Sequence, residues 1–403
     1  LMRILIINQP YWPDVVSTAQ HMTDWASHMA ALGHEVTVIA SRSVYGKQGA
    51  VLPKSETHAG VRIRRVGSNL FRKGGTLTRI VDFGLFHLRA LAKALQLPRQ
   101  DVVVCLTTPP FIGIVGTLLK SIRGSRFIQY EMDLYPDIAI ALGTLKKNSL
   151  PARFFERIHR RILRKADRVI VLGRCMQRVI AAKGVPESKM ALITPWADPG
   201  EIAPIPPRDN PFRAAHGWTN QHIIMYAGNL GLGHDTKTLL AAIGQLGADP
   251  ALRFVFIGGG KRMAEIRAAA IEKKLQNVEI LDYVPREQLG QMLAAGDIHL
   301  ITQGEGTSGL IVPSKLYGIL AAGRPVLYLG PDDTEIALTL QEDDVGCVVK
   351  IGEVDRLVAA IQHLRSGSDA IALRSRAALQ RQHTRSQCVQ RLTEVAESLI
   401  PAR

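Results

Sequence analysis

Residues 304–327 read GEGTSGLIVPSKLYGILAAGRPVL and lie between two short apolar runs. The apolar runs predict strands, and the residues between them predict a glycine-containing loop followed by a short helix. Pro313 and Ser314 suit the first turn of that helix, and Gly323 suits its end. Glycines let a backbone approach a ligand closely, and a helix N-terminus attracts anions. Lys315 adds a positive charge at the same place, which favours a phosphate site, although an ordinary strand–loop–helix with a surface lysine fits these residues equally well.

The same alternation of apolar runs and helical segments extends in both directions from this stretch. At the N-terminus, an apolar run over residues 2–8 precedes a helix predicted over 17–32 and a second strand predicted over 34–40. Six prolines between residues 195 and 211 exclude a continuous helix there and predict an interdomain linker. The chain therefore predicts an α/β protein with two doubly wound parallel sheets.

Length and composition narrow the class of protein. The 403 residues are 46% apolar, which is enough for two hydrophobic cores. No apolar run reaches the ~18 residues that a membrane-spanning helix needs, and the N-terminus lacks the pattern of a signal peptide. The four cysteines are scattered without metal-binding spacing, so we expect reduced thiols in the cytosol.

The net positive charge lies entirely in the first half of the chain. Residues 1–203 hold 29 Lys and Arg against 14 Asp and Glu, whereas the remainder holds 21 of each. This asymmetry predicts an anionic partner for the first half, and the most basic segment is residues 153–168. That segment predicts an amphipathic helix on an anionic membrane, or a helix whose apolar side packs on the core while its basic side attracts the membrane from a distance. The chain carries no nucleic-acid-binding motif, so we expect no nucleic-acid partner.

Two further segments carry groups that could bind or react. A strand predicted over 223–228 leads into a glycine-rich turn, and the run 254–260 ends in three glycines, an arrangement suited to a phosphate but not specific to one. Glu131 and Asp133 follow another predicted strand, at the end where ligands bind in open α/β sheets. Asp133, or secondarily Glu131, could act as a general base or hydrogen-bond acceptor, but Asp133 could equally cap the turn that follows.

The run VPSKLYGILAAGRP, residues 312–325, resembles the donor-binding signature of family 4 glycosyltransferases. The resemblance is to the branch that builds bacterial exopolysaccharide, O-antigen or capsule. It implies the GT-B fold, in which two Rossmann-like domains face a central cleft. The implied boundaries are residues 1–200 for an acceptor-binding domain, 201–380 for a donor-binding domain, and 381–403 for a helix that returns to the first domain.

The resemblance also implies an activity. Such enzymes take a sugar from a nucleotide-diphosphate donor, here UDP- or GDP-linked, retain its anomeric configuration and need no metal or other cofactor. The implied acceptor is a glycan or a polyprenyl-diphosphate-linked sugar, met by a cytoplasmic protein that binds the inner face of the membrane peripherally. The implied catalytic residues are Asp133, Glu131 and Lys315. The implied donor-binding residues are Gly228, Asn229, Gly231, Gly258, Tyr283, Val284, Gly309, Ser314 and Lys315.

The chain departs from the family pattern at one place. Many members carry two glutamates eight residues apart, and the matching positions here are Leu310 and Gly318. Glu305 is the nearest substitute in the sequence. Two alternatives therefore stay open, a nucleotide-sugar epimerase of the same fold and a non-catalytic nucleotide-binding scaffold. A Rossmann dehydrogenase is disfavoured because no GxGxxG follows the first strand.

Overall fold

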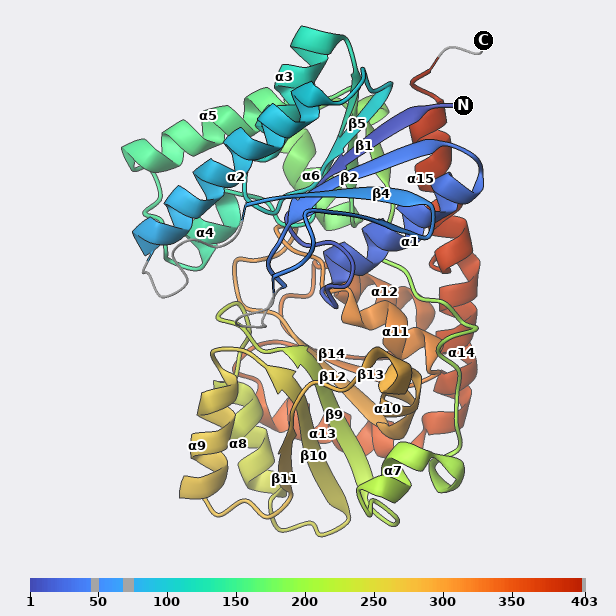
Figure 1. Ribbon diagram of the computed structural model, residues 1–403. Helices are drawn as coiled ribbons and strands as arrows, with labels where there is room; N and C mark the ends of the chain where they lie inside the picture. Colours follow the sequence, from blue (N-terminus) through green and yellow to red (C-terminus); the bar gives the residue numbers. More distant parts are fainter. Residues whose placement is uncertain (45–50, 68–75, 401–403) are drawn as a thin grey trace. The chain divides into compact units, whose positions relative to one another are not determined.

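A computed structural model describes residues 1–44, 51–67 and 76–400 of the chain. These residues form two compact units (Figure 1). The first unit comprises Leu1–Thr194 together with Gln387–Arg403, and the second comprises Pro195–Ser386. The sequence predicted the corresponding boundaries after residues 200 and 380, whereas the two units divide after Thr194 and Ser386.

The first unit is built on an eight-stranded sheet. In spatial order its strands are β3 (Ser55–His58), β4 (Val61–Val66), β2 (Glu35–Ser41), β1 (Arg3–Ile7), β5 (Val102–Cys105), β6 (Arg126–Tyr130), β7 (Arg168–Val171) and β8 (Met190–Leu192). All neighbours are parallel except β3 and β4, which are antiparallel. The polar edge strand β3 was not predicted, because its sequence SETH gives no apolar run.

Helices cover this sheet on both faces, as a doubly wound unit requires. They are α1 (Ser17–Ala31), α2 (Thr76–Gln96), α3 (Gly113–Arg123), α4 (Asp137–Ala141), α5 (Leu150–Lys165), α6 (Arg174–Ala182), the short turn η1 (Glu187–Lys189) and α15 (Arg385–Glu397). The last of these packs beside α1, where Trp25 Nε1 donates to Thr393 Oγ1 at 3.2 Å.

The second unit has a six-stranded, wholly parallel sheet. Its order is β11 (Val278–Leu281), β10 (Leu252–Gly259), β9 (His222–Asn229), β12 (Ile298–Thr302), β13 (Val326–Leu329) and β14 (Gly346–Val349). Its helical segments are η2 (Pro207–Asp209), α7 (Pro211–Ala215), α8 (Lys237–Leu246), α9 (Met263–Glu272), η3 (Arg286–Gln288), α10 (Leu289–Ala295), α11 (Lys315–Ala321), α12 (Glu335–Asp343), α13 (Val354–Ser366) and α14 (Ser368–Gln382). The prediction of two parallel α/β units is confirmed.

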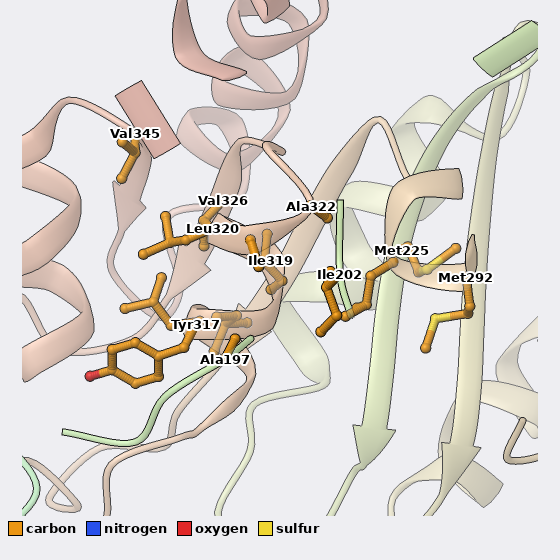
Figure 2. Packing of buried hydrophobic residues seen from close by; sticks show 14 of the residues in the cluster. Ala197, Ile202, Met225, Met292, Tyr317, Ile319, Leu320, Ala322, Val326 and Val345 are labelled. Carbon is orange, nitrogen blue, oxygen red and sulfur yellow. The ribbon is translucent and has the colours of Figure 1, made fainter. Parts of the chain in front are cut away.

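Helix α11 is held by the core of the second unit. Its Ile319 and Leu320 are almost fully buried in one cluster with Met225 of β9 and Val326 of β13 (Figure 2). Burying each such side chain contributes roughly 1.5–3 kcal/mol. The loop that leads into α11 therefore ends on a fixed element.

The proline-rich segment packs on this same core, since Ala197 and Ile202 belong to the cluster (Figure 2). The resemblance implied one helix over residues 381–403, whereas in the structure α14 ends at Gln382 and α15 begins at Arg385. Helix α14 ends before His383, whose carbonyl oxygen accepts from the Ala197 N–H at 3.3 Å, and the Arg385 N–H donates to the Ala197 carbonyl at 2.9 Å. These backbone groups pair with Ala197 instead of continuing the helix.

Among the described residues, no helix combines the length and the apolar character needed to cross a membrane.

Candidate functional site

Three loops of the second unit meet where β9, β10 and β12 end. The Leu230 N–H donates to the Gly259 carbonyl at 2.7 Å, and the Gly304 N–H donates to the Gly233 carbonyl at 2.7 Å. Carboxyl ends of parallel strands lie at one edge of the sheet, which is where ligands bind in open α/β folds. The backbone bonds therefore join the glycine-rich turn to both neighbouring loops as one surface.

Glycine is required at two points of this surface. Gly228 and Gly258 both have φ of 125°, a conformation that side-chain-bearing residues rarely adopt. A Cβ at Gly228 would lie 2.8 Å from Lys315 Cε, and one at Gly258 would collide with the carbonyl oxygen of Gly228. The ring of Tyr283 lies beside Gly258 and is 60% exposed. Four of the predicted donor-binding residues are thus neighbours, although they are separated in sequence.

Lys315 reaches this surface from the start of α11. Its Nζ lies 3.8 Å from the centroid of the Tyr226 ring and donates to the hydroxyl of the same tyrosine. The Tyr226 hydroxyl in turn donates to the Asn229 carbonyl at 2.9 Å. Within the described ranges Lys315 has no ion pair, and burial lowers the pKa of its ammonium to about 7. In its protonated form the group is therefore a cation without a fixed counter-charge.

The other predicted donor-binding residues differ in their surroundings. Gly231 lies within the glycine-rich turn beside the Asn229 side chain, and Val284 packs against the core cluster. Gly309 takes a positive φ of 72° in the loop before α11. Ser314 occupies the N-cap position of α11, but its side chain makes no capping hydrogen bond. The structure does not test whether any of them contacts a donor, so their roles stay predictions.

The position of the missing glutamate is apolar. A Cβ at Gly318 would lie 3.1 Å from Leu293 Cδ1 and 3.8 Å from Ile202 Cδ1, and Leu310 is buried. Glu305 is exposed in the loop. A carboxylate at position 318 would be surrounded by aliphatic side chains, which fits its replacement by glycine.

Three residues near Lys315 were not assigned a role from the sequence. Tyr226 lies within an apolar strand and has the pattern of a core residue. His234 donates from Nδ1 to the Thr302 carbonyl at 2.6 Å, and burial, with the charge of Lys315, lowers its pKa to about 4. Arg262 binds the turn through the Leu232 carbonyl at 3.4 Å and pairs with Glu265 at 3.1 Å. The nearby glycines are the sequence signal that could have identified His234 and Arg262 as site residues.

The first unit holds the two carboxylates predicted to act on an acceptor. Asp133 is partly exposed after β6, and its N–H donates to Thr107 Oγ1 at 3.3 Å. Burial, followed by the charge of Glu131, raises the pKa of Asp133 to about 6. Glu131 is only 1% exposed and lies 3.1 Å from His159 Nε2 through Oε1. Asp133 is therefore the more accessible of the two.

A trio of potential metal ligands lies nearby in the first unit. Ligand atoms of Asp137, Glu156 and His159 lie within 4.8 Å of one another. The ammonium of Lys183 donates to Asp137 Oδ2 and to Glu156 Oε2, each at 2.8 Å. Lys183 thus supplies the positive charge that these carboxylates need. The expectation of a metal-independent reaction is not tested by this arrangement.

Helix α5 presents the basic segment predicted from the sequence. Its buried residues are Ala152, His159, Ile162 and Leu163. Its exposed basic residues are Arg153, Arg157, Arg160, Arg161, Arg164 and Lys165. Leu150 and Phe154 are also exposed, at 81% and 57%. The apolar stripe thus packs inward for the most part, and the membrane contact stays a prediction.

Comparison with known proteins gives two matching family models. A glycosyl transferase 4-like domain matches residues 18–196, and a glycosyl transferases group 1 domain matches residues 221–366. Together these two matches cover most of the chain.

Two curated proteins are similar in sequence. The probable glycosyltransferase WbjE of Pseudomonas aeruginosa is 30% identical over 270 residues, which are 67% of this chain and 66% of that protein. The putative colanic acid biosynthesis glycosyl transferase WcaI of Escherichia coli strain K12 is 24% identical over 373 residues, covering 90% of this chain and 91% of that protein.

Solved structures of low sequence identity share the fold. Sucrose-phosphate synthase from Thermosynechococcus elongatus aligns with a TM-score of 0.79 and 15% identity over 99% of both chains. Anabaena Alr3699/HepE in complex with UDP-glucose aligns with a TM-score of 0.73 and 15% identity over 99% of this chain and 100% of that one. The two-domain GT-B fold implied by the sequence is confirmed.

Proposed function

Because this chain belongs to the glycosyltransferase family whose 4-like and group 1 domains it matches, we propose that it transfers a sugar from a nucleoside-diphosphate donor, UDP- or GDP-linked, to an acceptor hydroxyl. The observation that carries this proposal is Lys315, an ammonium without an ion pair in the described part of the chain, beside glycines at the ends of β9 and β10. The similar fold of HepE, solved with UDP-glucose, supports a nucleotide-sugar donor.

In the proposed reaction, the anomeric carbon exchanges its bond to the diphosphate for a bond to the acceptor oxygen, with its configuration retained. Lys315 and backbone N–H groups of the glycine turns stabilise the negative charge that develops on the leaving diphosphate, and no metal is required. Asp133 acts as the general base that takes the proton of the acceptor hydroxyl as the acceptor oxygen bonds to the anomeric carbon. Glu131, held by His159, contributes negative charge behind it.

The proposed acceptor belongs to bacterial surface polysaccharide synthesis, as the name of the relative WcaI suggests. A glycan carried on polyprenyl diphosphate would place the reaction at the inner face of the membrane. The exposed basic side of α5 supports peripheral attachment there, because anionic lipids attract Lys and Arg by about 1 kcal/mol each. Exposed Leu150 and Phe154 at the start of α5 would add apolar contact. Nothing observed favours an epimerase or a scaffold over a transferase.

The donor role is tested by Lys315→Ala. We expect loss of transfer and of the thermal stabilisation by UDP or GDP, because the diphosphate loses its cation. The matched control is Lys237→Ala, which removes an exposed lysine near the same turn. Product analysis should find a glycosylated acceptor and free nucleoside diphosphate. Wild-type donor kinetics in Lys315→Ala would remove this residue from the mechanism.

The membrane role is tested with vesicles of phosphatidylglycerol and phosphatidylcholine. A triple variant of α5, with Arg153, Arg157 and Arg161 changed to Gln, should bind anionic vesicles roughly a hundredfold more weakly at low salt. The control changes three exposed basic residues of the second unit to Gln, namely Arg267, Lys273 and Lys274. Equal losses in the two variants would mean that net charge, and not α5, determines the binding.

A further inference from the structure

Tyr226 occupies an unusual position for a tyrosine of a strand core. The side chain is 1% exposed and packs in the cluster between β9 and α8, yet its hydroxyl reaches the surface formed by the glycine turns. This hydroxyl donates to the Asn229 carbonyl at 2.9 Å, so its lone pairs are left to accept from Lys315. One side chain thereby joins the end of β9 to the start of α11.

The contact with Lys315 is polar but leaves the ammonium uncompensated. The hydroxyl accepts one of the three N–H groups, and the ring face lies 3.8 Å from Nζ, which attracts a cation. Neither interaction neutralises the positive charge. A carboxylate at the same place would do so, and would then compete with an anionic ligand.

The charged and titratable groups around Lys315 do not supply a counter-charge either. His234 is neutral, because its pKa is lowered to about 4, and Arg262 is cationic and already paired with Glu265. Burial, followed by the nearby phenol of Tyr283, raises the pKa of Tyr226, so the phenol of Tyr226 stays protonated. Burial also lowers the pKa of Lys315 to about 7, so that part of the population is unprotonated at neutral pH.

We propose that Tyr226 is a positioning residue that holds Lys315 unpaired over the glycine turns, so that a nucleoside diphosphate becomes its first anionic partner. The inference rests on the proposed donor role of Lys315 and adds a second residue to it. A free lysine side chain loses rotamer entropy when it is immobilised. Tyr226 restricts Lys315 before the ligand arrives, which reduces that cost.

Proton uptake follows from the charge balance of binding. The diphosphate stabilises the ammonium form, so the fraction of Lys315 that is neutral takes one proton from solvent and no covalent bond changes. UDP and GDP are suitable probes at about pH 8, where their phosphates are almost fully ionised because the last phosphate pKa is near 6. Uptake measured there then belongs to the protein.

The experiment is titration calorimetry of UDP and GDP in buffers of different ionisation enthalpy, on the whole chain. Wild type should take up a substantial fraction of a proton, and Lys315→Met should take up none. Tyr226→Phe should bind roughly 3- to 10-fold more weakly, as expected for one lost hydrogen bond, with a changed proton uptake and a donor KM raised more than kcat is lowered. The matched control is Tyr328→Phe, which removes another buried tyrosine hydroxyl of the same sheet, bonded to Gln303 at 3.1 Å.

The outcomes separate this inference from the proposed function. If wild type binds the nucleotides and Tyr226→Phe binds them with equal affinity and equal proton uptake, the role of Tyr226 is refuted and the donor site stands. If both phenylalanine variants lose affinity equally, the effect is a general loss of packing and the role is again refuted. Failure of wild type to bind either nucleotide would overturn the donor site and the inference together.

Discussion

Asp133, the proposed general base, is held in surroundings that disfavour its charged form. Burial, with the nearby charge of Glu131, raises its pKa from 3.8 to about 6. Because the folded state holds the proton more tightly than the unfolded state, this carboxyl favours folding below pH 4. That benefit is lost as the pH rises through 6, and the charged form then opposes folding.

Asp133→Asn should therefore raise the free energy of unfolding by about 1–2 kcal/mol at about pH 7.5, and by much less at about pH 4.5. The same variant should lose transfer activity while UDP or GDP still binds, since the acceptor hydroxyl loses its general base. Denaturant titrations at the two pH values and donor calorimetry measure both effects. An equal gain in stability at both pH values would show that Asp133 is not a perturbed carboxyl.

The sequence predicted those site residues that belong to a recognisable local motif. It missed those whose role depends on contacts with residues far away in the sequence. Lys315 follows a proline and a serine in a recognisable sequence motif. The glycines of the turns are recognisable because several of them lie close together in the sequence. Tyr226 contacts Lys315 across 89 positions, and Glu131 contacts His159 across 28. Such pairings depend on strand order, which residue types alone do not specify.

Helix α15 belongs to the first unit, and its packing there can be tested by a single substitution. Leu392 is fully buried on its inner side, close to the hydrogen bond between Trp25 and Thr393. Leu392→Ala should cost about 2–5 kcal/mol, because it removes buried methyl groups and leaves a cavity. The control is Leu373→Ala on α14, where the side chain is 76% exposed and the expected change is within about 0.5 kcal/mol.

Unfolding followed by hydrogen exchange in peptides of the first unit measures this loss. If Leu392→Ala left exchange in α1 unchanged, α15 would be a passive tail of that unit. The sequence predicted helix α1 over residues 17–32, close to its observed ends at Ser17 and Ala31. It missed the break after α14, because the pairing of His383 and Arg385 with Ala197 is a long-range backbone contact.

Net charge is distributed unevenly along the whole chain, which fits the two anionic partners proposed for it. The net charge of residues 1–203 is strongly positive, with 29 basic against 14 acidic residues, and the remainder is balanced at 21 of each. The first half can therefore attract an extended anionic surface over long distances. In the second half, the proposed donor site offers Lys315 and backbone N–H groups at one place, which suits a small anion such as a diphosphate.

Hydrogen exchange on the intact chain tests this division. UDP or GDP should slow exchange in the turns at residues 228–234 and 258–262, because backbone N–H groups there become ligand contacts. Phosphatidylglycerol vesicles without nucleotide should instead slow exchange within α5 and leave those turns unchanged, since lipid headgroups act on exposed Arg and Lys side chains. Phosphatidylcholine vesicles serve as the uncharged control and should change neither region. Vesicle protection confined to the glycine turns would assign the membrane contact to the second unit and contradict the role given to α5.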